Sequence, residues 1–246
     1  MLSYQHGYHA GNLADLHKHR VLAEWLVRLT HESSPITYIE THAGRGVYDL
    51  CSDESRKTGE AQSGIERSLN NKELPDDHPY YAVIQKTKKR YGASWYPGSP
   101  TIARQLLREQ DMLHLFELHP QEYAALKARI RAKNIRITQK DGYAGALSLA
   151  RAAKGRGLVL IDPSYEVKHE YDLVVECVRE LHNKWPQAAV LVWYPILEAG
   201  LHRSMVEALS QLASGRVFHD EAVFPPDSGL RMQGSGLWGG GLAKRG

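Results

Sequence analysis

A polar cluster, Asp162-Pro163-Ser164-Tyr165, directly follows the apolar run Leu158–Ile161 and brings an acid, a proline and an aromatic side chain together. A short apolar run that is partly β-branched is typical of a buried strand. Pro163 ends that strand because it has no N–H to continue a ladder. In open α/β sheets the carboxyl edge of the strands is where ligands bind. The cluster is therefore predicted to face a ligand.

The chemistry that suits this cluster is attack by the exocyclic amine of a nucleobase. That nitrogen is a poor nucleophile because its lone pair is delocalised into the ring. The Asp162 carboxylate and the Pro163 carbonyl can accept its two hydrogens, and Tyr165 can stack on the base. The alternative is a plain strand-end turn with a capping Asp and a packing Tyr, and the four residues alone allow both interpretations.

Strands and helices alternate along the rest of the chain, which predicts a mostly parallel, doubly wound α/β sheet with right-handed crossovers. Strands are expected over 36–40, 112–116, 135–138, 158–161, 189–194 and about 216–224. Helices are expected over about 14–29, 99–108, 121–131, 143–153, 171–183 and 201–213.

Two segments depart from this alternation. Residues 50–97 are charged, contain the breaker Pro-Asp-Asp-His-Pro at 75–79 and carry a basic run at 86–90, which predicts a small helical insertion with a basic face. The end of the chain has six glycines from Gly234 to Gly246, which is typical of a flexible segment. We therefore expect a main domain of residues 1–49 and 98–235, an insertion of residues 50–97, and a flexible Gly-rich tail of residues 236–246.

The bulk composition is that of a globular protein that is mildly basic. The net charge of +3 is compatible with a nucleic-acid partner, and no apolar stretch approaches the about 18 residues of a membrane span. The two cysteines, Cys51 and Cys177, have no metal or redox spacing and fit a reducing cytosol. Among the many histidines near the N-terminus, His17 and His19 cannot share a helix face, so no metal site is expected.

Polar residues recur where the predicted strands end. Small residues after the first strand, such as Gly44, let a ligand approach the backbone. Glu117, after the second strand, can accept both hydroxyls of a ribose. Asp141, followed by Gly142, can accept an adenine amine after the third strand. Together with Asp162 after the fourth strand, these residues favour an adenosyl cofactor.

Other nucleotide-binding classes are less well supported. The segment Gly44–Asp49 lacks the third glycine of the dinucleotide fingerprint, which disfavours NAD. No Gly-x-x-x-x-Gly-Lys-Ser/Thr motif occurs, so an ATPase has no support.

At these residues the chain resembles the bacterial adenine-N6 methyltransferases of 23S ribosomal RNA, the J-type large-subunit enzymes, a family also described by a role in using external DNA as a nutrient. The resemblance runs from residue 1 to about 235, and its N-terminal block and Tyr-Pro-Gly-Ser-Pro turn are more specific than the general methyltransferase signs. The matching segments are Met1–Tyr4, His6, His9–Asn12, Ala14-Asp15, Lys18-His19, Thr41–Gly44, Gly46, Tyr48, Tyr96–Pro100, Leu106–Asp111, Glu117–Pro120, Asp141-Gly142, Ile161–Pro163, Tyr165 and Trp193–Pro195.

The resemblance implies a Rossmann-like class I S-adenosylmethionine-dependent methyltransferase that acts on adenine N6 of 23S ribosomal RNA, a cytoplasmic protein that needs no metal and is expected to be a monomer. Asp162, Pro163 and Tyr165 would be catalytic, and Tyr4, Lys18 and Tyr165 would contact the substrate. The insertion 50–97 would help to hold RNA. The cofactor would be held by His19, His42, Ser99, Glu117, Asp141, Gly142 and Asp162, with Gly44 allowing its approach.

The chain departs from the family pattern at two places. Ser164 stands where the family usually has a second proline, so we expect a less rigid loop and reduced, rather than absent, activity. After Gly234–Leu237 an apolar final strand and a further helix are expected, but Trp238-Gly239-Gly240-Gly241 follows. The seventh strand is therefore expected to be short or missing, which would expose a sheet edge and favour self-association.

Three alternatives remain beside this interpretation. DNA adenine is the first, because the Asp-Pro-x-Tyr cluster contacts only the base. The second is a nucleic-acid-binding protein that has lost catalysis, which Ser164 and the unusual C-terminus suggest. A nuclease acting on imported DNA is the third, and the sequence shows no metal-binding carboxylate cluster that would support it.

Overall fold

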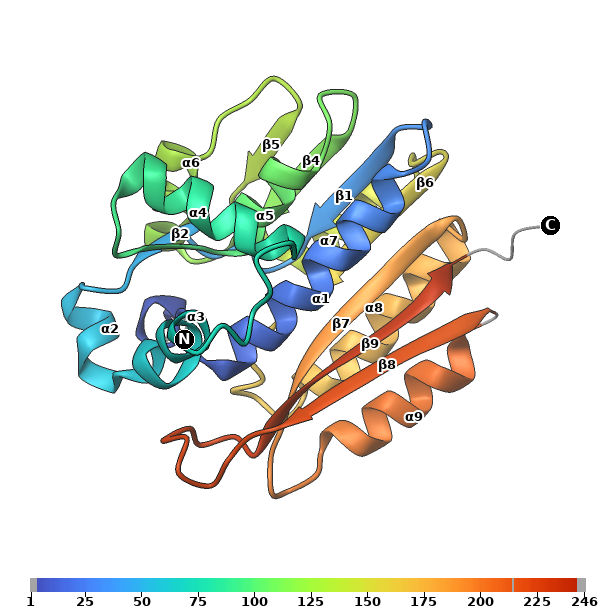
Figure 1. Cartoon of the computed structure of the whole chain (residues 1–246). Helices are drawn as coiled ribbons and strands as arrows, with labels where there is room; N and C mark the ends of the chain where they lie inside the picture. The colour runs from blue at the N-terminus through green and yellow to red at the C-terminus, as the bar shows by residue number, and fades with distance from the viewer. Residues whose placement is uncertain (1–3, 214, 243–246) are drawn as a thin grey trace.

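A seven-stranded sheet forms the centre of the computed structural model, which describes residues 4–213 and 215–242 (Figure 1). The strand order is β5-β4-β1-β6-β7-β9-β8. The first five strands in this order pair in parallel, and β9 pairs antiparallel with both β7 and β8, so the predicted mostly parallel sheet is confirmed. The strands are β1 (Ile36–Glu40), β4 (Met112–Phe116), β5 (Ile135–Thr138), β6 (Arg156–Ile161), β7 (Ala188–Ile196), β8 (Arg216–Val223) and β9 (Gly234–Leu242). Met1–Ser3, part of the matching N-terminal block, and residues 243–246 of the expected tail lie outside the described residues.

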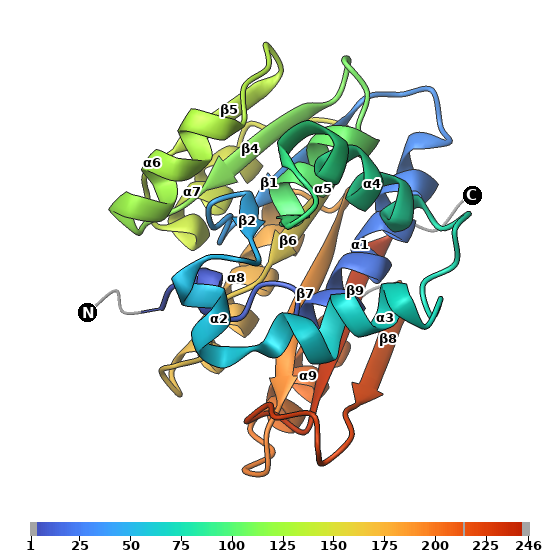
Figure 2. The ribbon, with the colours of Figure 1, turned by 60° about the vertical axis from the view of Figure 1, so that its left-hand side comes forward.

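Helices cover both faces of this sheet (Figures 1 and 2). On one face α1 and α5 pack against each other, and on the other α8 packs between α7 and α9. Capping side chains mark two of the helix starts that lie beside the cavity described below: Asn12 accepts the Asp15 N–H at 2.8 Å, and Asp141 accepts the Ala144 N–H at 2.8 Å. These helices are α1 (Leu13–Thr30), α5 (Ser99–Leu106), α6 (Pro120–Arg129), α7 (Gly142–Ala150), α8 (Glu170–Lys184) and α9 (His202–Leu212). A short 3₁₀ turn, η1 (His6–Tyr8), precedes α1.

The segment 50–97 is helical, as predicted. It contains α2 (Asp53–Thr58), a π-helical turn η2 (Gln62–Glu66), α3 (Arg67–Asn70) and α4 (Pro79–Tyr91). It ends in β3 (Trp95–Pro97), which pairs antiparallel with β2 (Val47–Asp49). Because α4 packs on both α1 and α5, the segment lies directly against the main sheet's helices (Figure 2).

The prediction of a flexible tail is wrong for residues 236–242. They belong to β9, which lies between β7 and β8 and hydrogen-bonds to both. A Cβ atom on Gly236 would lie 2.2 Å from the Tyr194 ring, and one on Gly239 would lie 2.6 Å from the Trp25 ring. The glycines therefore make room for aromatic rings, and they do so within a paired strand whose register against β8 shifts once, between Arg216 and Phe218.

The prediction of a short or missing seventh strand is wrong for the same reason. β9 pairs with β7 over seven residue pairs, from Ile196 opposite Gly234 to Val190 opposite Gly240. Of the strands that the structure describes, β5 and β8 form the edges of the sheet. Self-association through an edge left open by a missing C-terminal strand therefore has no structural basis.

None of the helices in residues 4–213 and 215–242 is both long and apolar enough to cross a bilayer. The same residues contain no group of three or more His, Cys, Asp or Glu side chains arranged to hold a metal ion. Cys51 is exposed, Cys177 is buried, and both are free thiols.

Candidate active site

A cavity of about 490 Å³ opens where the parallel strands end, and all twelve predicted site residues line it. It brings together segments up to about 160 residues apart in the sequence because parallel strands deliver their carboxyl ends to one edge. The twelve residues are Tyr4, Lys18, His19, His42, Gly44, Ser99, Glu117, Asp141, Gly142, Asp162, Pro163 and Tyr165.

One side of the cavity is formed by the loops after β1, β4 and β5, and we call it the cofactor side because the sequence predicts that its residues hold the cofactor. The Glu117 carboxylate accepts the Gly44 N–H and the His119 N–H, each at 2.7 Å. Burial raises the pKa of Glu117, and these two backbone donors counteract that rise. Gly44 has a φ of +59°, a conformation that favours glycine and turns its N–H toward Glu117.

Asp141, Gly142 and His42 complete the cofactor side. Asp141 is exposed at the start of α7, and Gly142 lies so close to the backbone of Thr41 that a Cβ would be 1.9 Å from its carbonyl oxygen. His42 Nδ1 lies 2.8 Å from the Thr41 hydroxyl, and burial lowers the pKa of His42 to about 4. His42 is therefore neutral at pH 7.

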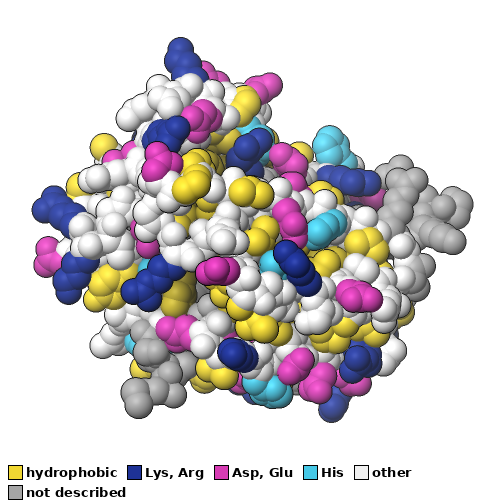
Figure 3. All heavy atoms as spheres, turned by 90° about the horizontal axis from the view of Figure 1, so that it is seen from below, with side chains coloured by type: hydrophobic (Ala, Val, Ile, Leu, Met, Phe, Trp, Pro, Cys, Tyr) yellow, Lys and Arg dark blue, Asp and Glu magenta, His cyan; other side chains and the backbone are white. Residues whose placement is uncertain are grey.

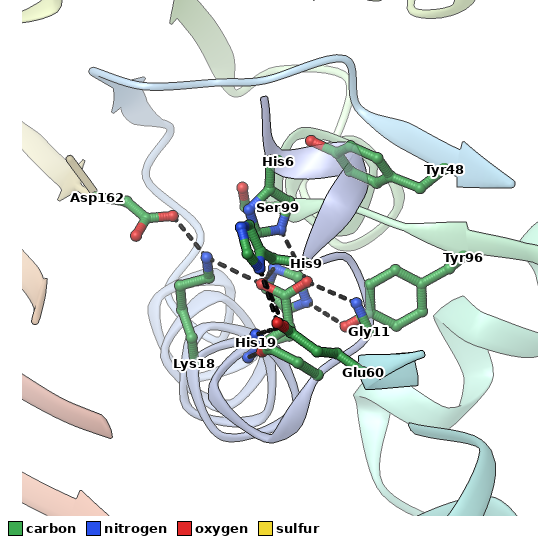
Figure 4. Close-up of polar contacts among 12 residues, drawn as sticks. His6, His9, Gly11, Lys18, His19, Tyr48, Glu60, Tyr96, Ser99 and Asp162 are labelled. Carbon is green, nitrogen blue, oxygen red and sulfur yellow. Dashed lines mark hydrogen bonds and ion pairs between the residues drawn. The ribbon is translucent and has the colours of Figure 1, made fainter. Parts of the chain in front are cut away.

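The opposite side, the base side, is a network of side-chain ion pairs centred on Lys18 (Figure 4). Lys18 Nζ lies 2.6 Å from Asp162 Oδ2 and 3.1 Å from Asp15 Oδ1. Burial opposes the ammonium charge, but Asp162 and Asp15 outweigh it and raise the pKa of Lys18. Burial also raises the pKa of Asp162, and Lys18 counteracts this rise, which favours the ionised carboxylate.

Asp15 extends this network to the N-terminal arm. Its Oδ2 atom lies 2.9 Å from His6 Nε2 and accepts the Gly11 N–H at 2.9 Å. Burial would raise the pKa of Asp15, but His6 and Lys18 outweigh it and hold that pKa well below its usual range. Asp15 is therefore a buried anion to which Lys18 and the arm are both attached.

Tyr4 lies on this arm at the mouth of the cavity. Its ring stacks on His9 with the centroids 5.7 Å apart and the planes at 8°, and its hydroxyl lies 2.9 Å from His6 Nδ1. His9 Nδ1 in turn lies 3.0 Å from Glu60 Oε1. The arm is thus docked on the segment 50–97 through His9 and on α1 through His6.

His19 is a buried, neutral member of the site. Its Nδ1 atom lies 2.8 Å from the Tyr96 hydroxyl, which also accepts a hydrogen bond from Tyr80 at 2.6 Å. Burial lowers the pKa of His19 to about 3. His19 therefore connects α1 to β3 and α4, and its Nε2 atom lies 3.8 Å from Asp15 Oδ1.

Ser99 donates a hydrogen bond to the buried Glu40 at the end of β1. The Tyr38 hydroxyl also donates to Glu40, at 3.1 Å. Burial raises the pKa of Glu40 to about 8 despite these donors. Ser99 thus connects the start of α5 to the first strand.

Tyr165 lies against protein groups in this structure. Its φ is +54°, its hydroxyl donates to the Trp193 carbonyl at 2.8 Å, and its ring lies 4.6 Å from that of Tyr171. Stacking on a base stays a prediction for this residue. Trp193, on the neighbouring strand, lines the same cavity and lies under the Lys18 ammonium, 5.3 Å from ring centroid to Nζ.

Asp15 and Trp193 belong to the site without having been predicted from the sequence as site residues. The spacing of Asp15 and Lys18, three residues apart on one helix, is a signal that two charges share a helix face. Trp193 belongs to a segment that matches the family, but only the order of the strands brings β7 beside Asp162.

The cavity fits a polar ligand of nucleoside size. Its volume lies in the range of about 300 to 1,000 Å³ that is usual for small-molecule sites. Three atoms of its lining residues, His119 Nδ1, Tyr143 Oη and Glu170 Oε2, are buried and have no hydrogen-bond partner within the described residues. Such atoms are costly unless a ligand satisfies them, so the donor set is consistent with an adenosyl amino acid.

Comparison with known proteins gives one consistent result. A family model described as "Ribosomal RNA large subunit methyltransferase D, RlmJ" matches residues 33–238. Two relatives named ribosomal RNA large subunit methyltransferase J are similar over nearly the whole chain. The one from Escherichia coli (strain K12) is 37% identical over 240 residues, and the one from Haemophilus influenzae is 38% identical over 242 residues. Both alignments cover 96% of this chain and 86% of the relative.

Solved structures agree with this comparison. A protein from Legionella pneumophila str. Philadelphia 1 matches with a TM-score of 0.84 and 34% identity, covering 96% of this chain and 88% of that one. The methyltransferase domain of METTL16 matches with a TM-score of 0.52 at 8% identity, covering 93% of this chain and 68% of that one, which shows a shared fold.

Proposed function

The chain belongs to the family of the ribosomal RNA large subunit methyltransferase J enzymes, and we propose that it transfers a methyl group from S-adenosylmethionine to the N6 amine of an adenine in 23S ribosomal RNA. The observation that carries this proposal is the Asp162 carboxylate, set at the end of β6 and paired with Lys18 inside the cavity. A ribosomal RNA substrate would place the protein in the cytoplasm.

The cofactor side supplies the groups that would hold S-adenosylmethionine. Glu117 keeps free lone pairs for the ribose hydroxyls, because a carboxylate has about four acceptor sites and the backbone uses two. Asp141 would accept the adenine amine of the cofactor. Further contacts would come from His19, His42, Gly44, Ser99, Gly142 and Asp162. When bound, the cofactor supplies an electrophilic methyl group on a sulfonium centre.

The base side supplies the groups that would activate the target amine. Lys18 binds Asp162 Oδ2, and no donor among the described residues contacts Oδ1. Oδ1 can therefore accept one hydrogen of the amine while the Pro163 carbonyl accepts the other, which draws the lone pair out of the ring. Catalysis would come from this polarisation and from positioning, and the proton can leave through Asp162 after methyl transfer.

Two residues would hold the nucleotide around this amine. Tyr4, partly exposed at the cavity mouth, would cover the base. Tyr165 would stack on it after release of its present contacts. The Asp-Pro-Ser-Tyr cluster contacts only the base, so the choice of RNA over DNA rests on the family.

The decisive experiment is methyl transfer from labelled S-adenosylmethionine to protein-free 23S RNA. Duplex DNA serves as the alternative substrate, and an Asp162→Asn enzyme serves as the control for chemistry. Label on RNA adenine N6 that is lost in the variant supports the reaction and the role of Asp162 together. Label on DNA alone would keep the mechanism and overturn the substrate, and cofactor binding without any label would favour a protein that has lost catalysis.

A further inference from the structure

The positive charge of this chain is concentrated in two segments. Residues 79–108 and 123–140 contain six lysines and arginines each and no aspartate or glutamate. The remaining 19 of the 31 basic residues stand against all 28 acidic ones. The net charge of +3 is therefore the sum of two strongly basic segments and an acidic rest of the chain.

A row of four side chains that contact one another connects the two segments. The Arg129 guanidinium on α6 lies 5.3 Å from the centre of the Trp95 ring on β3. Trp95 lies 5.6 Å from Tyr91 at the end of α4, and the Arg90 guanidinium lies 5.2 Å from that ring. The contact between Arg129 and Trp95 joins the end of α6 to β3, which follows α4 in the chain. Two adjacent aromatic rings are thus flanked by a guanidinium group at each end.

A hollow of about 300 Å³ lies between the same two segments. Its polar lining residues are Lys86 of α4, Arg104 and Gln105 of α5, and Arg108, Glu109 and Asn134, so one carboxylate lies among the basic groups. Arg104 Nε and Gln105 Oε1 are buried and have no hydrogen-bond partner within the described residues. The hollow therefore offers one unused donor and one unused acceptor beside a lysine.

The cations of this surface are available for a partner. Of the twelve, Arg108 alone forms an ion pair with a carboxylate among the described residues, with Asp111 at 2.8 Å. By contrast, the face seen from below in Figure 3 mixes acidic and basic side chains. We call the set Lys86, Lys89, Arg90, Tyr91, Trp95, Arg104, Gln105, Arg129 and Arg131 the basic surface.

We propose that the basic surface binds the ribose–phosphate backbone of RNA beyond the nucleotide that enters the cavity. Phosphates are attracted by unpaired arginines and lysines, and unpaired bases stack on exposed aromatic rings. In the hollow, a phosphate oxygen accepts from Arg104, and a ribose 2′-hydroxyl donates to Gln105 Oε1. The segment 50–97 supplies only one part of this surface, and α5 and α6 supply the rest.

The basic surface is within reach of the same RNA strand as the cavity, and in this respect the inference rests on the proposed function. The start of α6 lines the cavity at His119 and Glu122. Arg129 ends the same ten-residue helix, about 15 Å away at about 1.5 Å per residue. An RNA with only one nucleotide on each side of its target adenine extends about 7 Å either way even when fully stretched, about twice the spacing in a stacked strand, and does not reach this far.

The test compares two double variants that remove the same charge. Arg90→Gln with Arg129→Gln removes two cations of the basic surface, and Arg179→Gln with Arg203→Gln removes two exposed cations from α8 and α9 as the control. The readout is the affinity for a protein-free 23S RNA fragment as a function of salt concentration. Each lost phosphate contact lowers the slope of log affinity against log salt by about 0.7 to 0.9. We expect the slope to fall by about 1.5 in the first variant and to stay unchanged in the second.

Methylation assays separate this inference from the proposed function. With the long RNA, KM is expected to rise about tenfold in the Arg90/Arg129 variant at fixed kcat, whereas the three-nucleotide RNA is methylated equally by all proteins. Equal salt slopes in both variants, or no RNA binding by the wild type, overturn the basic surface. RNA bound through this surface without any methyl transfer would overturn the proposed function and leave the surface standing.

A Gln105→Met variant tests the hollow by itself. Loss of the acceptor is expected to weaken binding of the long RNA about threefold, while binding of a DNA strand of the same sequence is unchanged, because DNA has no 2′-hydroxyl. An equal loss for both strands would show that Gln105 does not contact the ribose.

Discussion

The two sides of the cavity hold their carboxylates in different ways. On the cofactor side, Glu117 and Asp141 accept hydrogen bonds from backbone N–H groups of nearby loops and helix starts. On the base side, Asp15 and Asp162 are held through the Lys18 ammonium, which reaches both from α1. Backbone donors stay in place when a neighbouring side chain is replaced, whereas an ion pair fails when either partner is removed.

This difference predicts that the two sides of the cavity respond differently to single substitutions. A single substitution on the cofactor side removes one contact to a ligand. On the base side it leaves a buried charge without its partner, which costs about 3–5 kcal/mol in proteins generally. We therefore expect a single substitution on the cofactor side to weaken cofactor binding moderately. A single substitution on the base side is expected to lower the rate of methyl transfer strongly.

Asp162→Asn carries the largest expected effect. The amide oxygen is a weaker acceptor than a carboxylate and its NH₂ group repels the amine, so the single-turnover rate is expected to fall at least about 100-fold. Cofactor affinity measured by calorimetry is expected to change less than about threefold. Asp172→Asn, an exposed carboxylate on α8, is the matched control, and a comparable fall there would break the comparison.

Lys18→Met tests how the base side is held. Burial raises the pKa of Asp162 and Lys18 lowers it, so without Lys18 that pKa rises further. Since the ionised carboxylate is the acceptor, activity should begin to fall at a higher pH as the solution is acidified. We also expect kcat at neutral pH to fall about tenfold. A pH–rate profile measures both, and an acid limb at the wild-type position would show that Lys18 does not support the charge of Asp162.

Glu117→Gln tests the cofactor side. The amide keeps one acceptor oxygen but loses the charge and the second acceptor, so the Kd for S-adenosylmethionine should rise about tenfold, equivalent to about 1.4 kcal/mol. The value of kcat at saturating cofactor is expected to stay within about threefold. If kcat falls as much as affinity, the two sides of the cavity do not act separately.

Ser164→Pro has the smallest expected effect. Proline at this position restricts the loop between Pro163 and Tyr165 and restores the residue usual in the family. We expect kcat to rise about two- to threefold with no change in the Kd for the cofactor. A variant that is no faster than the wild type would contradict the idea that Ser164 weakens the base side.

Periodicity and strand-end position were enough to predict most of the fold and much of the site. The strands 36–40, 112–116 and 135–138 have the predicted bounds, because each is a short run rich in β-branched or apolar residues between polar turns. Glu117, Asp141 and Asp162 meet in one cavity because each follows a parallel strand. Local sequence is sufficient to predict such features, since parallel strands all end at the same edge of the sheet and the residues after them therefore lie close together.

The Gly-rich segment 234–242 shows where this reasoning fails. Its glycines are typical of a flexible tail when only neighbours in sequence are considered. Their function is to admit the rings of Tyr194 and Trp25, which lie about 40 and more than 200 residues away. A steric requirement of this kind depends on partners that only the assembled sheet brings close.

The sequence by itself therefore determined the alternation of most strands and helices along the chain, the residues at the strand ends and the family to which the chain belongs. Only the tertiary structure decided that Lys18 lies between Asp15 and Asp162, that Trp193 lines the cavity, and that two basic segments form one surface. The physical reason is that spacing along the chain determines local geometry, whereas ion pairs, ring contacts and charged surfaces depend on distances between segments that folding brings together.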